Sequence, residues 1–205
     1  MVAVEPEETV EQRFVDDDWY GRDLGSERFI GCTLTEVDLT EARSSGAVFD
    51  RCRFDRCRLN VSEHRGSAFT SCTFVGTSWF GAVLDGCKLV GSSFDRCVLR
   101  PLTVTGGQWR GVVLAGADLS GLDLRRLQLQ DADLTAARLR DCDLRGVDLT
   151  AASVEGADLA GADLRGAALL GVDLELARLR RTRVDLAGGV AVAERHGAVV
   201  EVPEA

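Results

Sequence analysis

The sequence repeats with a period of five residues, and the register does not slip from Phe14 to Val184. Thirty-five positions in this span have numbers ending in 4 or 9, and 33 of them are apolar. The two exceptions are Ser44 and His64. Helices repeat at 3.6 residues and strands at 2, so neither element alone explains a period of five.

Two further positions complete the repeat unit. Two residues before each central position, 28 of 35 residues are Ala, Cys, Ser, Thr, Val or Gly. Two residues after it lie 17 of the 22 glycines, so the unit reads small-x-Leu/Phe-x-Gly, as in 157–161 and 162–166. Because glycine tolerates a positive φ, we expect each unit to be a short extended piece followed by a turn. The large residue would then fill a core, and the small one would fit where backbones crowd.

This A-D-L-x-G pattern resembles that of the pentapeptide-repeat family and covers residues 14–184. The resemblance implies an all-β fold: a right-handed quadrilateral β-helix with four pentapeptides per coil and a short C-terminal helix. About nine such coils, at the roughly 4.8 Å spacing of paired strands, would form a rod about 40 Å long. Ser44 and His64 are separated by four pentapeptides, which is one implied coil, so they would stack and could form a hydrogen bond.

The composition narrows the classes of function. The chain has 24 basic and 33 acidic residues, a net charge of −9, which disfavours direct nucleic-acid binding. The N-terminus lacks a basic start followed by an apolar run, and no apolar stretch approaches the about 18 residues of a membrane span. We therefore expect a cytoplasmic protein that contacts neither a membrane nor nucleic acid directly.

The sequence offers few candidates for chemistry. All seven cysteines occupy the small position of the repeat, which favours buried packing over the alternatives of disulfides or a metal site. His64 is expected to be a hydrogen-bonded core residue. No nucleophile elbow, P-loop or dinucleotide-binding motif occurs. We expect no enzyme activity, and neither catalytic residues, a cofactor nor a bound metal.

The two ends depart from the repeat. Residues 1–13 are acidic without clear pentapeptides and are predicted to be a flexible tail. Residues 185–205 are predicted to cap the solenoid, alone or jointly with a second copy. Asp185 would begin a helix that runs to about His196, and 198–202 would be a strand. The apolar residues on one face of this helix are Leu186, Val190 and Ala193.

Charge is uneven along the rod. Residues 1–41 have a net charge of −9, residues 42–110 of +5 and residues 111–185 of −3. The middle of the rod is therefore basic.

Aspartates recur at every fourth pentapeptide in the C-terminal half. Asp123, Asp143 and Asp163 would form a ladder of carboxylates about 5 Å apart, with Asp118 and Asp158 on a neighbouring face. Two interpretations stay open. These side chains are solvated or hydrogen-bonded to turn backbone, or they form a partner-binding surface that imitates the regular charge of a DNA backbone.

Three segments resemble more narrowly the gyrase-interacting, MfpA-like group of this family: 64–69, 99–103 and the Ala/Val-rich stretch after Arg183. The resemblance implies a homodimer through the C-terminal ends that mimics duplex DNA. It implies binding to DNA gyrase, a type II topoisomerase, and modulation of that enzyme or protection from fluoroquinolones or natural poisons. A generic protein-interaction scaffold without gyrase activity is the alternative.

The resemblance and the charge pattern together give two sets of candidate residues. The predicted gyrase-binding residues are Asp118, Asp123, Asp143, Asp158 and Asp163. The predicted dimer-interface residues are Leu186, Val190, Ala193, Val199 and Val200.

Overall fold

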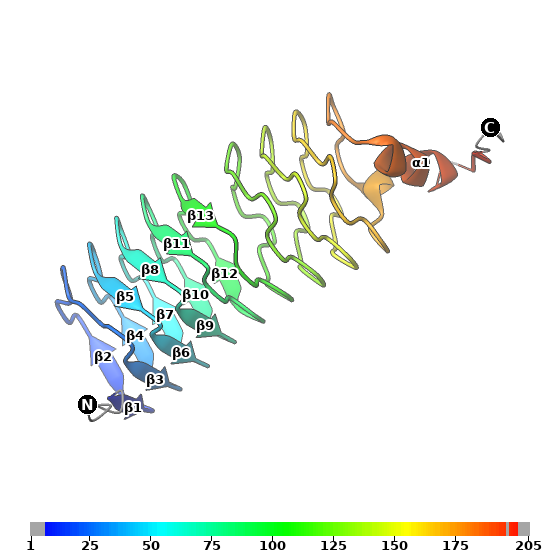
Figure 1. Cartoon of the computed structure of the whole chain (residues 1–205). Coiled ribbons are helices and arrows are strands. Elements are labelled where there is room, and N and C mark those ends of the chain that lie inside the picture. The colour runs from blue at the N-terminus through cyan, green and yellow to red at the C-terminus, as the bar shows by residue number, and fades with distance from the viewer. Residues whose placement is uncertain (1–6, 196, 201–205) are drawn as a thin grey trace.

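A computed structural model describes residues 7–195 and 197–200. They form one continuous solenoid whose coils stack from the N-terminus toward a helix at the C-terminal end (Figure 1). Residues 8–184, at four pentapeptides per coil, make about nine coils. The predicted all-β solenoid with a short C-terminal helix is confirmed.

Each coil consists of four pentapeptides because each strand pairs in parallel with the strand four units further along the chain. Phe29, for example, pairs with Phe49, which pairs in turn with Phe69. Successive pentapeptides form four faces. We name them by their central residues, which recur on the same face at every fourth unit. Face I starts at Thr9, face II at Phe14, face III at Trp19 and face IV at Leu24.

Three of the faces carry parallel sheets of three-residue strands in the first five coils. Face I holds β1 (Glu8–Val10), β3 (Arg28–Ile30), β6 (Val48–Asp50) and β9 (Ala68–Thr70). Face II holds β2 (Arg13–Val15), β4 (Thr33–Thr35), β7 (Arg53–Asp55), β10 (Thr73–Val75) and β12 (Ser93–Asp95). Face IV holds β5 (Arg43–Ser45), β8 (Glu63–Arg65), β11 (Val83–Asp85) and β13 (Thr103–Thr105). Face III, and all faces of the later coils, are joined by single parallel bridges in the same register.

Aspartate explains much of this change from strands to bridges. Eleven aspartates stand directly before a central residue, and each accepts a hydrogen bond from the backbone N–H two residues on. Such a bond turns the backbone away from an extended path. None of the strands in the described part of the chain begins with Asp, and eight of these eleven aspartates lie beyond residue 110.

The central residues fill the core. Phe29, Phe49 and Phe69 stack with ring centroids 4.8 and 4.9 Å apart, and a second stack of phenylalanines runs up face II. The turn position two residues after each centre adopts a positive φ in nearly every unit, including units where this position is not glycine. This confirms the role predicted for glycine there.

Ser44 and His64, the two polar central residues of the predicted repeat, pair as predicted. Ser44 Oγ lies 2.7 Å from His64 Nδ1, and His64 Nε2 lies 3.1 Å from Ser62 Oγ. The Ser62 hydroxyl donates to the Leu59 carbonyl, so it accepts from Nε2–H, which makes Nδ1 the acceptor for Ser44. His64 is fully buried, and this burial lowers its pKa to about 4, so the imidazole is neutral.

The cysteines pack as small inward residues. Six are buried and Cys97 is half-buried. Each thiol donates to the carbonyl oxygen of a central residue 23 positions earlier, at 3.0–3.5 Å. Burial raises the pKa of Cys57, Cys87 and Cys142 to about 11, which keeps these thiols protonated.

The solenoid begins earlier than predicted. Glu8–Val10 forms strand β1, which pairs with β3, so residues 8–13 belong to the first coil and not to a flexible tail. Thr9 occupies a central position in the same register, a polar residue that the apolar pattern did not include. Residues 1–6 of the predicted tail lie outside the described part of the chain.

The C-terminal helix α1 spans Leu186–Arg195, and His196 lies outside the described residues. The described part of the predicted strand, 198–200, is not in a strand; its valines are exposed, and no described strand pairs with them. Residues 201 and 202 are not described. Among the described residues, no helix is long and apolar enough to cross a membrane.

The neutral state of buried His64 predicts a pH-dependent stability. The folded pKa is about 4 and the ordinary value is 6.5, so below pH 6.5 the unfolded chain binds a proton that the fold excludes. We expect about 3 kcal/mol of unfolding free energy to be lost between pH 6.5 and 4. Urea titrations monitored by tryptophan fluorescence would measure this loss. His64→Gln does not titrate and should flatten the dependence in this window; an unchanged slope would contradict a neutral His64.

Candidate partner-binding faces

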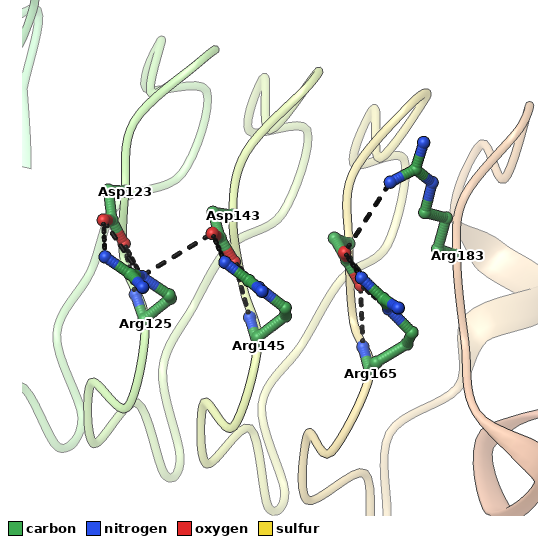
Figure 2. Close-up of polar contacts among 7 residues, drawn as sticks. Asp123, Arg125, Asp143, Arg145, Arg165 and Arg183 are labelled. Atoms are coloured by element: carbon green, nitrogen blue, oxygen red, sulfur yellow. Dashed lines mark hydrogen bonds and ion pairs between the residues drawn. The ribbon is translucent and has the colours of Figure 1, made fainter.

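The predicted carboxylate ladder lies on face IV, but each of its members is paired with an arginine. Arg125 lies two residues after Asp123 and binds both carboxylate oxygens, with Nη2 at 2.6 Å from Oδ2. Arg145 binds both oxygens of Asp143 in the same way, at 2.8 and 2.6 Å. Figure 2 shows the pairs repeating from coil to coil.

Asp163 is paired in the same way, and arginines also reach from one coil to the next. Arg165 holds both oxygens of Asp163, and Arg183 of the next coil approaches to 4.0 Å. Arg125 also reaches up to Asp143 at 3.6 Å, which ties one rung to the next. Charge repulsion between stacked carboxylates, which a bare ladder would suffer, is therefore offset by an adjacent column of guanidinium groups.

These contacts hold the carboxylates in the charged state. The side chain of Arg125 lowers the pKa of Asp123, and Arg145 does the same for Asp143. The hydrogen bond from Arg165 lowers the pKa of Asp163 to about 2. All three rungs are charged at neutral pH, and each is accompanied by a positive charge.

Asp118 and Asp158 lie on face III, next to the ladder, and they also have arginine partners. Arg100 lies 3.4 Å and Arg138 3.9 Å from Asp118, and Arg140 lies 3.4 Å from Asp158. All five predicted aspartates also accept the turn N–H two residues on. The sequence left two interpretations of these aspartates open. The structure shows the hydrogen bonds to turn backbone that the first of them expects.

Counting charge by face separates the two sides of the C-terminal half. Within 112–185, faces III and IV carry seven acidic and ten basic residues, a net charge of +3. Faces I and II carry six acidic residues and no basic residue, a net charge of −6. The six are Asp131, Asp133, Asp148, Glu155, Asp173 and Glu175.

The acidic side is thus the one that the sequence analysis did not select. Asp131 is paired with Arg110 of the coil below, whereas Asp133 and Asp148 bind only uncharged turn and side-chain donors among the described residues. The signal was present in the sequence: Asp-Leu-Arg recurs at 123, 143 and 163, whereas Asp133 and Asp148 are each followed by Leu-Thr. The predicted ladder included only the aspartates that recur one coil apart, and not the arginine that follows each of them two residues later.

Helix α1 closes the C-terminal end of the rod. Asp185 accepts the Gly188 N–H at 3.0 Å as the predicted N-cap, and its other oxygen accepts the Gly166 N–H at 2.7 Å. Gly188 is buried, and a β-carbon at this position would lie only 3.0 Å from the Val184 side chain. Val192, one turn later, also packs against the core.

The predicted interface residues lie away from this contact. Leu186 is 83% exposed, Val199 is 86% exposed, and Val190 and Ala193 are half-buried. The cap is therefore formed by a different side of the helix from the one predicted, where Gly188 allows close approach. Between α1 and the last coil lies an apolar groove of about 480 Å³, lined by Leu169, Leu170, Val172, Leu174, Ala191 and Val192 among others.

The repeat, its coil of four units and its four stacked faces decide the family. The pattern of the family Pentapeptide repeats matches this chain in eight copies over residues 28–60, 65–100, 110–141 and 142–181. The chain belongs to the pentapeptide-repeat family. It resembles the pentapeptide repeat protein MfpA of Mycolicibacterium smegmatis, with 44% identity over 48 residues, which are 23% of this chain and 25% of that protein.

The MfpA of Mycobacterium tuberculosis is 40% identical over 67 residues, 33% of this chain and 31% of that protein. These alignments span a third or less of the relatives' own length. A trypsin-treated variant of QnrB1, described as a plasmid-mediated fluoroquinolone resistance protein, has the same fold. Its TM-score is 0.84 over 96% of this chain and 98% of that chain, at 19% identity.

The Asp–Arg pairing predicts a measurable pKa change. In Arg165→Gln, the pKa of Asp163 should rise from about 2 toward its ordinary value of 3.8, because the charged partner is lost. Carboxyl-carbon NMR titration measures this directly. Arg181→Gln, which removes an arginine not paired with Asp163, is the control and should leave this pKa unchanged. A pKa that stays near 2 in Arg165→Gln would show that the turn N–H, not the guanidinium, sets it.

Proposed function

We propose that this chain binds DNA gyrase in place of duplex DNA, and so modulates the enzyme or protects it from fluoroquinolones or natural gyrase poisons. The local similarity to two MfpA proteins supports this assignment within the family. The observation that carries it is the net negative charge of faces I and II, with six acidic residues and no basic one within 112–176, of which Asp131 is paired with Arg110 of the coil below.

Such a surface suits an enzyme that handles DNA. A DNA-binding groove is basic, because it must neutralise phosphates. Acidic side chains spread over successive coils of the rod, with neutral side chains between them, offer this groove a surface of negative charge. Two rods of about 40 Å, end to end, would match some 24 base pairs at about 3.4 Å each.

The five aspartates predicted from the sequence are a second candidate surface. They lie on faces III and IV, where the local net charge is +3. Because their charge is offset by arginines, we propose faces I and II as the main contact with gyrase and retain the five aspartates as the competing hypothesis.

We further propose a homodimer through the C-terminal ends. Leu170, Leu176 and Leu186 are 78%, 52% and 83% exposed around the end of the rod, beside the apolar groove. Exposed leucines gathered at one end of an otherwise charged rod favour burial against a second copy. A protein-interaction scaffold unrelated to gyrase is the alternative function, favoured by the basic middle of the rod.

Two variants of equal charge change test the gyrase-binding surface. The first is Asp133→Asn/Glu155→Gln/Asp173→Asn on face II, and the second is Asp123→Asn/Asp143→Asn/Asp163→Asn on face IV. Asparagine can still accept the turn N–H, so both should fold like the parent. In a gyrase supercoiling assay, we expect the face II variant to need roughly tenfold more protein for the same effect, and the face IV variant to match the parent.

The reverse ranking would assign the contact to the five aspartates. A parent that has no effect on supercoiling, and no effect on fluoroquinolone-induced cleavage, would favour the scaffold. The difference between the variants should shrink as salt increases, because the attraction is electrostatic.

A single exposed substitution tests the C-terminal dimer. Leu186→Glu places a charge at the proposed interface without disturbing the core, so the fold of the monomer should not change. Light scattering should give 22.1 kDa for this variant and about twice that mass for the parent. Val15→Glu, an exposed apolar position on the first coil, is the matched control and should remain a dimer. A dimeric Leu186→Glu would place the interface elsewhere.

A further inference from the structure

Face III carries opposite charges at its two ends. At the N-terminal end, an open recess along its edge with face II is lined by Asp16, Asp17, Asp18, Glu36, Asp38, Arg56 and Arg58, with Tyr20 beside them. Five acidic and two basic residues give it a net charge of −3. Asp16, Asp17 and Asp18 have no ion pair among the described residues.

At the other end, the last coil of face III carries Arg178, Arg180 and Arg181, a net charge of +3 with no acidic residue in 177–182. All three side chains are exposed, and none has an ion pair within the described part of the chain. Elsewhere in the second half of this face, Asp118 and Asp158 are matched by arginines. Unbalanced charge therefore remains at both ends.

The two ends are placed symmetrically. The central residue beside Asp18 is Trp19 and the one beside Arg178 is Leu179, and each lies four coils from Leu99. A two-fold axis through face III at Leu99 would lay a second copy antiparallel on the first. It would place the acidic recess of each copy against the arginines of the other.

Three exposed apolar side chains lie near this axis, beside the ion pair between Arg100 and Asp118. Val61, Phe80 and Val98 are exposed by 52%, 52% and 50%, and they lie on adjacent coils. Val98 would lie on the axis. Phe80, one coil below it, would face the coil of Leu119 in the other copy, where Ser120 and Gly121 leave room for a ring.

Most of the arginines on face III between the axis and the ends are paired with an aspartate of the same copy. Arg58 bridges Asp38 at 2.8 Å on one side, and Arg140 bridges Asp158 on the other. In the antiparallel arrangement Asp38 lies opposite Asp158 of the other copy and Arg58 opposite Arg140, but each of these charges is already paired within its own copy. From these features we infer that face III is a second self-association surface, which pairs two copies side by side and antiparallel.

The contact should be weak. A face about 40 Å long and about 10 Å wide offers roughly 400 Å² per copy, half of the about 800 Å² that each partner contributes to a standard interface. This association goes beyond the proposed function and does not depend on it. Faces I and II and the C-terminal end all remain uncovered in the pair.

Sedimentation velocity on the full chain carrying Leu186→Glu isolates this contact from the proposed C-terminal dimer. At low salt, about 20 mM, we expect a concentration-dependent dimer that dissociates by about 0.5 M salt, because exposed charges are screened. Arg178→Glu/Arg180→Glu/Arg181→Glu should be monomeric at low salt. Asp16→Lys/Asp17→Lys/Asp18→Lys should be monomeric as well.

A mixture of the two charge-reversed variants gives the most direct test of the proposed contact. Each then presents one reversed end that complements the other, so a one-to-one heterodimer should form at low salt. Asp16→Asn/Asp17→Asn/Asp18→Asn retains the capping acceptor at position 18 and should also lose self-association, in case the lysine variant does not fold.

Three results would overturn the inference: a parent that stays monomeric at low salt, charge-reversed variants that associate as the parent does, or a mixture that remains monomeric. If the parent instead retains a 24-base-pair duplex that the arginine variant releases, the arginine end binds nucleic acid and the self-association account is wrong.

Discussion

The backbone hydrogen bonds between residues one coil apart are the constraint on which the rest of this structure depends. They fix the register at one full coil of four pentapeptides, so every side chain stacks directly on its equivalent in the next coil. In the core this is favourable, because phenylalanines stack on phenylalanines and the Ser44 hydroxyl forms a hydrogen bond with the His64 ring. On the surface the same register stacks like charges on one another, and their repulsion must be offset in each column of equivalent side chains.

The chain solves this problem differently on its two sides. On face IV, an arginine two residues after Asp123, Asp143 and Asp163 binds each carboxylate through both oxygens, and Arg125 also reaches Asp143. On faces I and II of the C-terminal half the acidic residues are separated by neutral side chains, and no basic residue occurs on these faces within 112–176. This division produces a rod with one strongly negative side, and the function that we propose rests on it.

The core and the repeat could be predicted from the sequence because every fifth residue along the solenoid is buried and is therefore apolar at almost every repeat. The cysteine positions, the Ser44–His64 pair and the N-cap at Asp185 followed from that register. The start of the solenoid was missed because Thr9 is polar. The buried side of α1 was missed because contact is made through Gly188, whose lack of a side chain permits the approach. The balance of charge on each face depends on pairs between coils and within a turn, which a count along the chain does not reveal.

The central claim is that the negative side of the rod, faces I and II of the C-terminal half, is the surface that meets a DNA-handling partner. Carboxyl-group footprinting of the complex with gyrase, read residue by residue by mass spectrometry, tests it most directly. The account predicts that Asp133, Glu155 and Asp173 lose labelling in the complex, while Asp123 and Asp143 label as they do in the free protein. Protection of the face IV pair with unchanged labelling of the face II residues would contradict it.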